Sequence, residues 1–576
     1  MKDSIFTNHT CNKLCMAVLF TVIFGASAAN AIDVPGNVTA GQVERRLQQP
    51  KTNLSAPDFE LPAAADSSEL SEATKKKLEQ SKFTLKQVEI EGSTVFTEDQ
   101  LKFAYEDFIG KKISLLDAMN IAKQITNLYR SNGYILSQAV IPEQELNNGV
   151  LKVRIVEGFI GSYNIQGDAI TEGQKSVIQS YADNILESRP VRTQKLERYL
   201  LLMNDLPGAK ITGLLRPSAS QFGAAELVLT VTDKAFEGAY SVNNRGSRTI
   251  GPWQHSVLGT ANSLLGMYDQ TSLRFSTTNP TTELRSYEFS HKQMLGEEGT
   301  SILGRFARTN TQPGENLKSL AIVGESNLFE AKLEHPFVRS RNQNLISRFA
   351  FEYNDTDTDV FKNVDFTEDR LRMLRLGTYF GFLDDWKGSN VLDLQLTQGL
   401  NIMNASEEGT NRSNTIGDSD FTKINFDASR LQNLFGQFSL LAAVSSQYSF
   451  DPLLVAEQFS LGGADFGRAY DPAELLGDSG IIGKLELRFD DVVGGQILQD
   501  YQLYTYYDLG EVRLRDVAPG VNQKFSLSSA GLGARANFTD NFSGNIELSF
   551  PLTKQVVAER TDGDDPRIFV GFLAQF

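Results

Sequence analysis

Residues 345–353 read LISRFAFEY, a stretch in which polarity changes from one residue to the next. One face is mostly apolar and the other carries the charges: Leu345, Ser347, Phe349, Phe351 and Tyr353 against Ile346, Arg348, Ala350 and Glu352. Because successive side chains of a β-strand point to opposite sides, this pattern predicts a strand with one apolar environment and one polar environment. The same alternation recurs at Lys484–Phe489 and Phe542–Phe550. A soluble β-sandwich would show it too, with the apolar face turned inward, so single strands leave both architectures open.

The amino terminus indicates that the chain is exported. A short polar start with two lysines precedes the apolar run Leu14–Gly25, and Ala29–Ala31 offers the small-residue pattern that signal peptidase cleaves. We therefore expect residues 1–31 to be a cleaved signal peptide. The alternative, an uncleaved membrane anchor, would need an apolar run of roughly 20 residues, longer than this one. Both cysteines, Cys11 and Cys15, lie in this segment, so the mature chain is expected to have neither a disulfide nor a thiol nucleophile.

The composition of the remaining chain favours a membrane protein built from strands. No later stretch approaches the length of a spanning helix, yet 41% of the residues are hydrophobic, 10% are aromatic and 46 are glycine. Lipid offers no partner to unpaired backbone groups, so such an exported chain is expected to close its sheet into a barrel. The formal net charge of -16 argues against nucleic acid as a partner, because nucleic acid favours a basic face.

The carboxyl-terminal region has the length and the ending expected of a barrel. At roughly 20 residues for a strand with its connection, residues 236–576 hold about 16 or 17 strands, and an even number gives 16. A lumen of that size passes an extended chain and therefore needs a plug at rest. The alternating run from Ile568 to Phe576 resembles the terminal signal by which outer-membrane barrels are recognised for insertion, with Phe576 as its last residue.

Between residues 83 and 235 the order strand, helix, helix, strand, strand occurs twice. In the first copy, 83–158, the expected elements are Leu85–Gly92, Thr97–Ile109, Ser114–Asn132, Ser137–Glu143 and Val150–Glu157. In the second copy, 159–235, they are Ser162–Gln166, Thr171–Leu186, Gln194–Asn204, Lys210–Arg216 and Glu226–Val231. Ser114 and Asp117 form a capping pair at the start of a helix with apolar residues at three-and-four spacing, and Gly133 ends it. Each copy is long enough for a small two-layer core.

Two runs inside these copies carry a family resemblance. Residues 125–158, ITNLYRSNGYILSQAVIPEQELNNGVLKVRIVEG, resemble the first POTRA domain of two-partner secretion transporters, the haemolysin secretion/activation family (TpsB). Residues 196–218, LERYLLLMNDLPGAKITGLLRPS, resemble the second POTRA domain of that family. The resemblance covers nearly all of the mature chain. It implies a transmembrane β-barrel of about 16 antiparallel strands, residues 236–576, with two amino-terminal α+β POTRA domains, 83–158 and 159–235.

The segment before the first copy fits the layout of that family. Residues 32–49 have the pattern of a short helix with the adjacent pair Arg45 and Arg46, and residues 50–82 form a linker rich in Pro, Ala, Ser and charge. The resemblance implies that this helix plugs the pore at rest. A disordered amino terminus is the alternative.

Residues 461–480, LGGADFGRAYDPAELLGDSG, form a long glycine-rich loop between strands expected at Leu453–Leu461 and Ile481–Phe489. The loop resembles the inward-folded loop of the wider superfamily, whose tip commonly reads Val-Arg-Gly-Tyr. Here Gly467 precedes Arg468 instead of following it, which leaves the tip conformation open. The matching wall motif is Tyr506-Tyr507-Asp508-Leu509-Gly510, and the polar character of its face predicts that Asp508 points into the lumen.

These two motifs predict an ion pair between loop and wall. An arginine holds a carboxylate through two parallel hydrogen bonds, so Arg468 and Asp508 are expected to fix the orientation of the loop. Gly467 and Tyr470 complete the tip motif, and Gly477 and Asp478 belong to the same lumen loop: its candidate residues are Gly467, Arg468, Tyr470, Gly477 and Asp478. The alternative is that Arg468 is a solvated loop residue.

The tetrapeptide Gly477–Gly480 also matches the nucleophile loop of chymotrypsin-like proteases. A serine nucleophile needs a histidine base, and His255, His291 and His335, which remain after signal removal, lie in no base motif. Ile481 follows where those proteases have another glycine. We therefore expect no enzyme activity. The sequence has no phosphate loop and no His or Cys spacing typical of metal sites, so no cofactor and no metal are expected.

The family resemblance implies a pore in the outer membrane of a Gram-negative bacterium, with its POTRA domains in the periplasm. Its partner would be a large secreted exoprotein of adhesin or haemolysin type, whose N-terminal targeting domain adds a strand to a POTRA sheet edge. The lipid bilayer and the barrel-assembly machinery are the other expected partners. Two alternatives stay open: a general outer-membrane insertase, which usually carries more POTRA domains, and a plain diffusion porin, which needs none.

Overall fold

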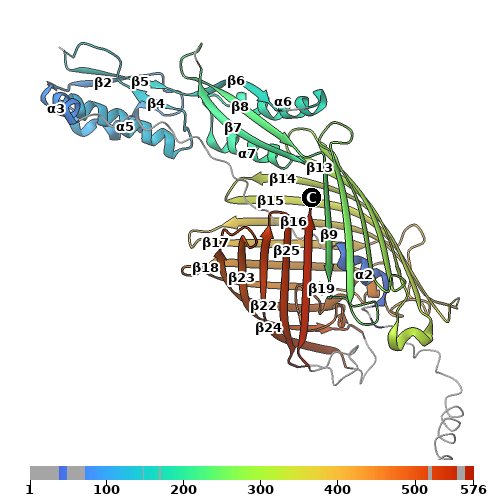
Figure 1. Cartoon of the computed structure of the whole chain (residues 1–576). Helices are drawn as coiled ribbons and strands as arrows, with labels where there is room; N and C mark the ends of the chain where they lie inside the picture. Colours follow the sequence, from blue (N-terminus) through green and yellow to red (C-terminus); the bar gives the residue numbers. More distant parts are fainter. Residues whose placement is uncertain are drawn as a thin grey trace, which may run out of the picture.

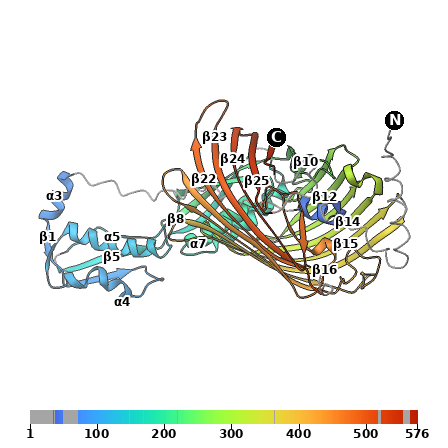
Figure 2. The same cartoon turned by 90° about the horizontal axis from the view of Figure 1, so that it is seen from below.

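The computed structural model describes residue 35 and residues 38–48, 72–146, 148–167, 170–218, 220–362, 364–516, 522–553 and 565–576. Two α+β modules follow one another outside a closed β-barrel, and one short helix lies within the barrel (Figure 1). Seen from below, the first module lies farther from the barrel than the second (Figure 2). The expected signal peptide falls outside the described residues. Among the residues that are described, no helix has the length and apolarity to cross a membrane.

The two helices before the first module differ in their surroundings. Helix α2 (Ala40–Gln48) lies in the barrel and covers the described part of the helix expected at 32–49. Helix α3 (Glu72–Gln80) occupies the end of the segment where the sequence predicts a linker. Its sequence, EATKKKLEQ, is rich in strong helix formers, which outweigh its low apolar content. The Ser81 carbonyl after α3 accepts a hydrogen bond from the Leu115 N–H at 3.0 Å, which joins this helix to the first module.

The first module, residues 82–158, is a three-stranded sheet covered by a long helix. Its elements are β1 (Lys82–Thr84), β2 (Gln87–Glu91), α4 (Glu98–Leu101), η2 (Lys102–Ala104), η3 (Glu106–Phe108), β3 (Lys112–Ser114), α5 (Leu115–Ser131), β4 (Gln138–Val140) and β5 (Val150–Val156). The sheet order is β2-β5-β4, with β2 parallel to β5. The capping pair of Ser114 and Asp117 is present at the start of α5, and Ile125 and Tyr129 of this helix are buried against Leu151 of the sheet.

The expected helix Thr97–Ile109 is wrong, because the chain forms only one helical turn, α4, followed by the two 3₁₀ turns η2 and η3. Tyr105 leaves the helical region with a φ of −140°. Leu101, Ala104 and Tyr105, at the spacing of one helix face, still reach the core of the module across this break.

The second module, residues 159–235, repeats this architecture. Its elements are β6 (Phe159–Gln166), α6 (Glu172–Leu186), α7 (Thr193–Asn204), β7 (Ala209–Pro217) and β8 (Ala224–Asp233). The sheet order is β6-β8-β7 with β6 parallel to β8, so the first strand again pairs with the third. The predicted internal repeat is therefore confirmed at the level of topology.

Within the described part of the chain, 16 antiparallel strands close the barrel, and the first, β9, pairs with the last, β26. The wall strands are β9 (Phe236–Asn243), β10 (Trp253–Asn262), β11 (Gln270–Asn279), β12 (Leu284–Leu295), β13 (Thr300–Thr311), β14 (Val323–Arg339), β15 (Gln343–Val360), β16 (Val364–Leu383), β17 (Gly388–Gly399), β18 (Thr422–Asn433), β19 (Phe438–Ser449), β22 (Ser479–Val492), β23 (Asp500–Arg513), β24 (Lys524–Thr539), β25 (Phe542–Pro551) and β26 (Arg567–Gln575). A closed barrel leaves no backbone edge toward lipid. The number of strands expected from length alone is confirmed.

The two faces of the wall strands have the predicted character. On β15, Phe349 is 49% exposed, whereas its neighbour Ala350 and the lumen residue Glu352 are buried. On β23, Leu503 and Tyr507 are exposed on the outside, and Tyr504, Tyr506 and Asp508 are buried toward the lumen. The outer surface is thus apolar and the inner surface polar, which excludes a β-sandwich with an inward apolar face.

The strand expected at Leu453–Leu461 is wrong. The wall strand β19 ends at Ser449, and the chain then turns inward through η5 (Val455–Glu457) and the short hairpin β20 (Phe459–Leu461) and β21 (Leu475–Gly477). Leu453, Leu454 and Ala456 are apolar because they pack inside the barrel against Leu371 and Met373 of β16, not because they face lipid. Local polarity alone does not distinguish these two apolar environments.

Candidate functional site

The lumen loop, residues 450–478, folds into the barrel and is held by its own small core. The hairpin β20–β21 carries the loop tip, which contains Gly467, Arg468 and Tyr470. Leu461, Ala469 and Tyr470 pack against Val512 and Leu527 of the wall. Gly467 adopts a left-handed φ of +67°, and a Cβ atom there would lie 2.9 Å from Leu527 Cδ1. The glycine before the arginine therefore makes the turn that brings Arg468 to the wall.

The structure brings Arg468 and Asp508 together. The Nε and Nη2 atoms of Arg468 donate to the two carboxylate oxygens of Asp508 at 3.1 and 3.0 Å, and the Arg468 backbone N–H donates to the same carboxylate at 3.1 Å. Both side chains are almost fully buried. The guanidinium also lies 3.4 Å from the centroid of the Tyr506 ring, which stacks against the cation. Arg468 is therefore a fixed, buried group and not a solvated loop residue.

Sequence reasoning missed the second carboxylate of this site. Glu486 on β22 accepts a hydrogen bond from Arg468 Nη1, and it also binds Arg535 at 2.9 Å and Arg488 at 2.8 Å. Its position in the alternating run Lys484–Phe489 predicts the lumen face but not this partner, because the pairing of β22 with β23 decides which side chains meet. A third acid, Glu547, lies 4.0 Å from Arg468.

The other predicted loop residues hold the loop in place without touching the ion pair. The Tyr470 hydroxyl donates to the Ser528 carbonyl at 3.0 Å. Asp478 accepts hydrogen bonds from the backbone N–H groups of Leu453 and Arg515 at 2.9 and 2.8 Å, so it anchors the base of the loop. Gly477 packs so closely against Val512 that a Cβ atom would approach it to 2.8 Å.

Ser479, the serine of the protease-like tetrapeptide, begins wall strand β22, and its hydroxyl accepts the Ser449 N–H at 3.0 Å. In the described ranges, the hydrogen bonds of the histidine rings go elsewhere: His255 to Tyr240, His291 to Thr271 and His335 to Thr300. The serine therefore has no histidine base in this part of the chain.

Helix α2 lies across the lumen near the strand ends that are farther from the two modules. Val38 and Val43 pack against Ile250 and Leu284, and the Thr311 hydroxyl donates to the Val38 carbonyl at 3.1 Å. Gly41 lies so close to the loop that an added Cβ atom would approach Ala456 Cβ to 2.9 Å. The helix is therefore wedged between the barrel wall and the base of the lumen loop.

A second buried ion cluster joins this helix to the loop and the wall. Glu457, at the end of η5, is fully buried and receives Arg45 of α2, Arg375 of β16 at 2.9 Å and Lys423 of β18 at 2.7 Å. Glu352 of β15 balances part of this positive charge through a 2.8 Å contact with Arg375. The sequence shows Arg45 as one of an arginine pair, but a single glutamate in a loop carries no signal that predicts its three cations.

The second module is docked onto the turns at one end of the barrel. Arg198 and Tyr199 of α7 bind Glu298, in the turn between β12 and β13, at 2.9 and 2.6 Å. Arg339 at the end of β14 holds Asp205 through two hydrogen bonds of 2.7 and 2.8 Å. Burial opposes ionisation of Glu298, but the hydrogen bonds from Tyr199 and Arg198 outweigh it and lower the pKa of this carboxyl below its ordinary 4.5.

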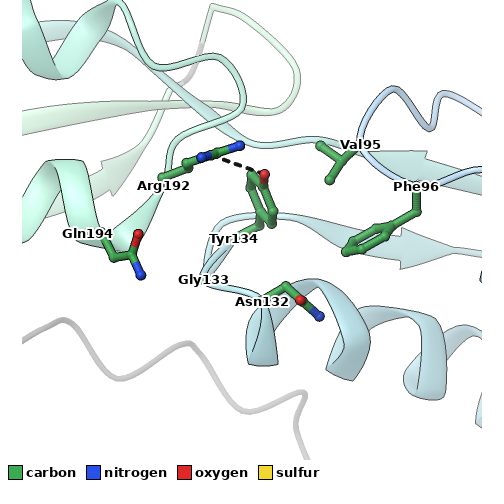
Figure 3. Close-up of a pocket in the computed structure, with 7 residues that line it drawn as sticks. All are labelled: Val95, Phe96, Asn132, Gly133, Tyr134, Arg192 and Gln194. Carbon is green, nitrogen blue, oxygen red and sulfur yellow. Dashed lines mark hydrogen bonds between the residues drawn. The ribbon is translucent and has the colours of Figure 1, made fainter.

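A cavity of about 210 Å³ lies at the joint between the two modules (Figure 3). Its lining residues come from the loop after β2, the end of α5 and the start of α7: Val95, Phe96, Asn132, Gly133, Tyr134, Arg192 and Gln194. Arg192 Nε donates to the Tyr134 hydroxyl at 3.1 Å, and the Thr193 N–H donates to the Gly133 carbonyl at 2.8 Å. Among the described residues that line it, Arg192 carries a guanidinium, a donor group suited to carboxylate or amide oxygens.

Phe576 ends the last wall strand with its side chain 69% exposed. Its backbone N–H donates to the Gly238 carbonyl of β9 at 2.9 Å, and its carbonyl accepts from Lys234 Nζ at 3.4 Å. The backbone of this residue thus closes the barrel while the ring remains outside.

Comparison with known proteins places these features in a family. The model of the haemolysin secretion/activation protein ShlB/FhaC/HecB matches residues 223–536, and that of the ShlB-type POTRA domain matches residues 83–158. The heme/hemopexin transporter protein HuxB of Haemophilus influenzae (strain 86-028NP) is 24% identical over 548 residues, covering 93% of this chain and 95% of HuxB. The outer membrane transporter CdiB of Dickeya dadantii is 23% identical over 420 residues, covering 71% of this chain and 72% of CdiB.

A solved structure shares the fold. CdiB from Escherichia coli superposes with a TM-score of 0.72 at 17% identity, covering 94% of this chain and 99% of that chain. The similarity extends over the modules and the barrel together, so the arrangement described above is that of a known architecture.

Proposed function

The chain belongs to the haemolysin secretion/activation protein family (ShlB/FhaC/HecB), and from that premise we propose how its pore is held shut and how it takes up its partner. It is an outer-membrane transporter of two-partner secretion, with its POTRA domains in the periplasm, and it secretes a large partner exoprotein. The proposed division is signal peptide 1–31, plug helix 32–49, linker 50–82, POTRA domains 83–158 and 159–235, and barrel 236–576.

The resting pore is closed by helix α2 and by the lumen loop together. The observation that carries this proposal is the buried contact between Arg45 of the helix and Glu457 of the loop, which links the two obstructions. Pulling the helix out would leave Glu457 with two cations in place of three, and would move Arg45 into water. Because the remaining charges still balance Glu457, this exchange is feasible without unfolding the wall.

The loop tip is held in one orientation against the wall of the pore. Arg468 is held by two carboxylates and an aromatic ring, which supports a role in orienting the tip against β22 and β23. This contact orients the loop more than it stabilises the fold, because the cost of desolvating a buried ion pair offsets much of its attraction. Asp508, Gly467 and Tyr470 serve the same orientation, and Gly477 and Asp478 fix the base of the loop.

The partner is captured in the periplasm before it reaches the pore. We assign the joint cavity beside Arg192 to an acidic or amide side chain of the partner's N-terminal targeting domain, and the edge strands of the POTRA sheets to its backbone. Arg192→Gln should then reduce export of the partner while the variant stays inserted. Arg154→Gln, on the outer surface of the first module, is the matched control because Arg154 is half exposed and makes only a 3.9 Å contact with Glu91.

The chain has no catalytic activity of its own in this proposal, and its insertion depends on the barrel-assembly machinery reading the last strand up to Phe576. The deciding experiment compares the proteins secreted by cells with and without this chain. Loss of one large exoprotein supports the proposal. Depletion of many outer-membrane proteins would indicate a general insertase instead, and an unchanged set of secreted proteins with a steady ion current would indicate a diffusion porin.

A further inference from the structure

The barrel seam, where the first strand meets the last, is paired only over part of its length. Paired residues run from Asn243 with Gly571 to Ala239 with Gln575, and Gly238 and Phe576 exchange two backbone hydrogen bonds beyond them, toward the periplasmic end. The outer part of β26, from Arg567 to Val570, extends past the end of β9. Asn244 covers some of this stretch, since its side chain binds the Ile568 carbonyl at 2.9 Å and the Val570 N–H at 2.7 Å.

Two arginines flank the seam at this level, one on each side. Arg245 follows β9 by two residues, and Arg567 is the first residue of β26. Both guanidinium groups pack on the ring of Phe569, at 3.9 and 5.0 Å from its centroid. Two cations repel each other, so placing both guanidinium groups on one ring requires acceptors that compensate both charges.

The tip of the lumen loop supplies those acceptors. Arg245 Nη1 donates to the Arg468 carbonyl at 2.9 Å, and Arg567 Nη1 donates to the carbonyl of the next residue, Ala469, also at 2.9 Å. The second donor of each arginine binds a buried acid, Glu547 at 2.7 Å for Arg245 and Asp471 at 2.6 Å for Arg567. Two consecutive carbonyls of one loop thus receive one hydrogen bond from each side of the seam.

We propose that Arg245 and Arg567 are positioning residues that tie the tip of the lumen loop across the barrel seam, so that release of the tip also weakens the closure between β9 and β26. The Arg468–Asp508 pair fixes the tip to the wall, and these two arginines fix the seam to the tip. A movement of the loop during secretion would then reach the seam directly. This inference rests on the closed state described above and does not require that the loop moves during export.

The test measures seam closure by disulfide trapping in the full-length protein in the outer membrane. Ser241 and Leu573 are register partners across the seam, and the mature chain is expected to have no cysteine. In a Ser241→Cys, Leu573→Cys background, mild oxidation should give a high yield of the disulfide. Adding Arg245→Gln and Arg567→Gln should lower the initial rate of its formation several-fold. Arg468→Gln, which frees the tip from the wall, should lower it as well.

A separate single-cysteine variant, Ala469→Cys, reports on the tip, because Ala469 is fully buried. Its labelling by a water-soluble maleimide should rise several-fold in the same arginine backgrounds. The matched control is Arg348→Gln, a lumen arginine paired with Asp393 on the opposite part of the wall, which should change neither readout. If the double variant does not insert, Arg245→Lys and Arg567→Lys are used instead, because they keep the charge and lose part of the hydrogen bonding. Their rates of disulfide formation and of maleimide labelling should lie between those of wild type and Arg468→Gln.

Two results would overturn the inference. The tip could become reactive while the seam disulfide forms at the wild-type rate, in which case the tip does not hold the seam. Alternatively the seam rate could fall in the arginine variants while Ala469→Cys stays protected, in which case the arginines act on the strands alone. Neither readout depends on export, so failure here is distinguishable from failure of the proposed function.

Discussion

Arg45, on the helix in the lumen, contacts Glu457, at the base of the lumen loop, and both lie inside the barrel. Glu457 is the shared partner of three cations from three elements, so the helix, the loop and the wall meet at one carboxylate. A single buried carboxylate that balances several cations makes their positions interdependent. Closure of this pore is therefore expected to respond to substitutions at either end of that contact.

Arg45→Gln should increase opening of the pore. The substitution removes the charged anchor of α2 and leaves Glu457 compensated by Arg375 and Lys423, so the wall should stay folded. Planar-bilayer recordings of the purified protein should show more frequent and longer conducting events. The matched control is Arg154→Gln on the first module. Equal conductance of the two variants would contradict a role of the Arg45–Glu457 contact in keeping the pore closed.

Arg468→Ala should give a folded, inserted barrel that exports poorly. It leaves Asp508 and Glu486 buried without their common cation, a local cost of about 3–5 kcal/mol that the loop can relieve by moving. Arg468→Lys keeps the charge but loses the parallel hydrogen bonds, so its export should lie between that of wild type and that of Arg468→Ala. Secreted partner per cell is the measurement, with heat-modifiable mobility as the check on folding; wild-type export by the alanine variant would refute the role.

Gly467→Ala should displace the loop tip even though it removes no polar contact. The residue has a φ of +67°, and an alanine Cβ atom there would meet Leu527 and Gly462. Left-handed backbone costs a residue with a Cβ atom about 1–2 kcal/mol. Limited proteolysis within 461–480 should become faster. Gly483→Ala, whose Cβ atom would contact only the Ala443 carbonyl at 3.7 Å, should leave the protein unchanged.

The docking of the second module should weaken in acid. The pKa of Glu298 is lowered below 4.5 in the folded state, so its contribution to stability is complete above pH 4.5 and is lost as the pH falls through the lower folded value. This carboxylate is half exposed, so the effect is under about 1 kcal/mol. Thermal unfolding of the second module should differ between wild type and Glu298→Gln at pH 7, and the difference should shrink toward pH 3. A constant difference would show that ionisation of Glu298 does not matter.

Phe576→Ser should reduce the amount of inserted protein but not the stability of what is inserted. The ring is largely exposed, whereas the backbone of this residue pairs with Gly238 and is kept by the substitution. Outer-membrane levels and the unfolding temperature of the purified protein are the two measurements. Phe435→Ser, another exposed ring on a periplasmic turn, is the control. A drop in both variants would indicate a general effect of lost apolar surface.

Several of the residues that hold the helix and the lumen loop in place could not be found from the sequence. The strand pattern predicts that Glu486 and Asp508 face the lumen, and the loop motif singles out Arg468, but Glu457, Arg245 and Arg567 carry no motif. Each of them meets partners that are distant along the chain, as Arg245 does with Arg468. Such contacts depend on the closure of the barrel and on the path of the loop inside it.

The sequence by itself determined the repeated modules, the number of strands and the lumen face of strands with clear alternation, such as those at 345–353, 484–489 and 542–550. These follow from local period-two and helical spacing and from length, which act within a few residues of each position. Only the tertiary structure decided that Leu453–Leu461 leaves the wall, that three cations share Glu457 and that the loop tip spans the seam. An apolar residue gains equally from lipid and from a buried core, and a charge selects its partner by distance in space, so neither outcome is written in the local pattern.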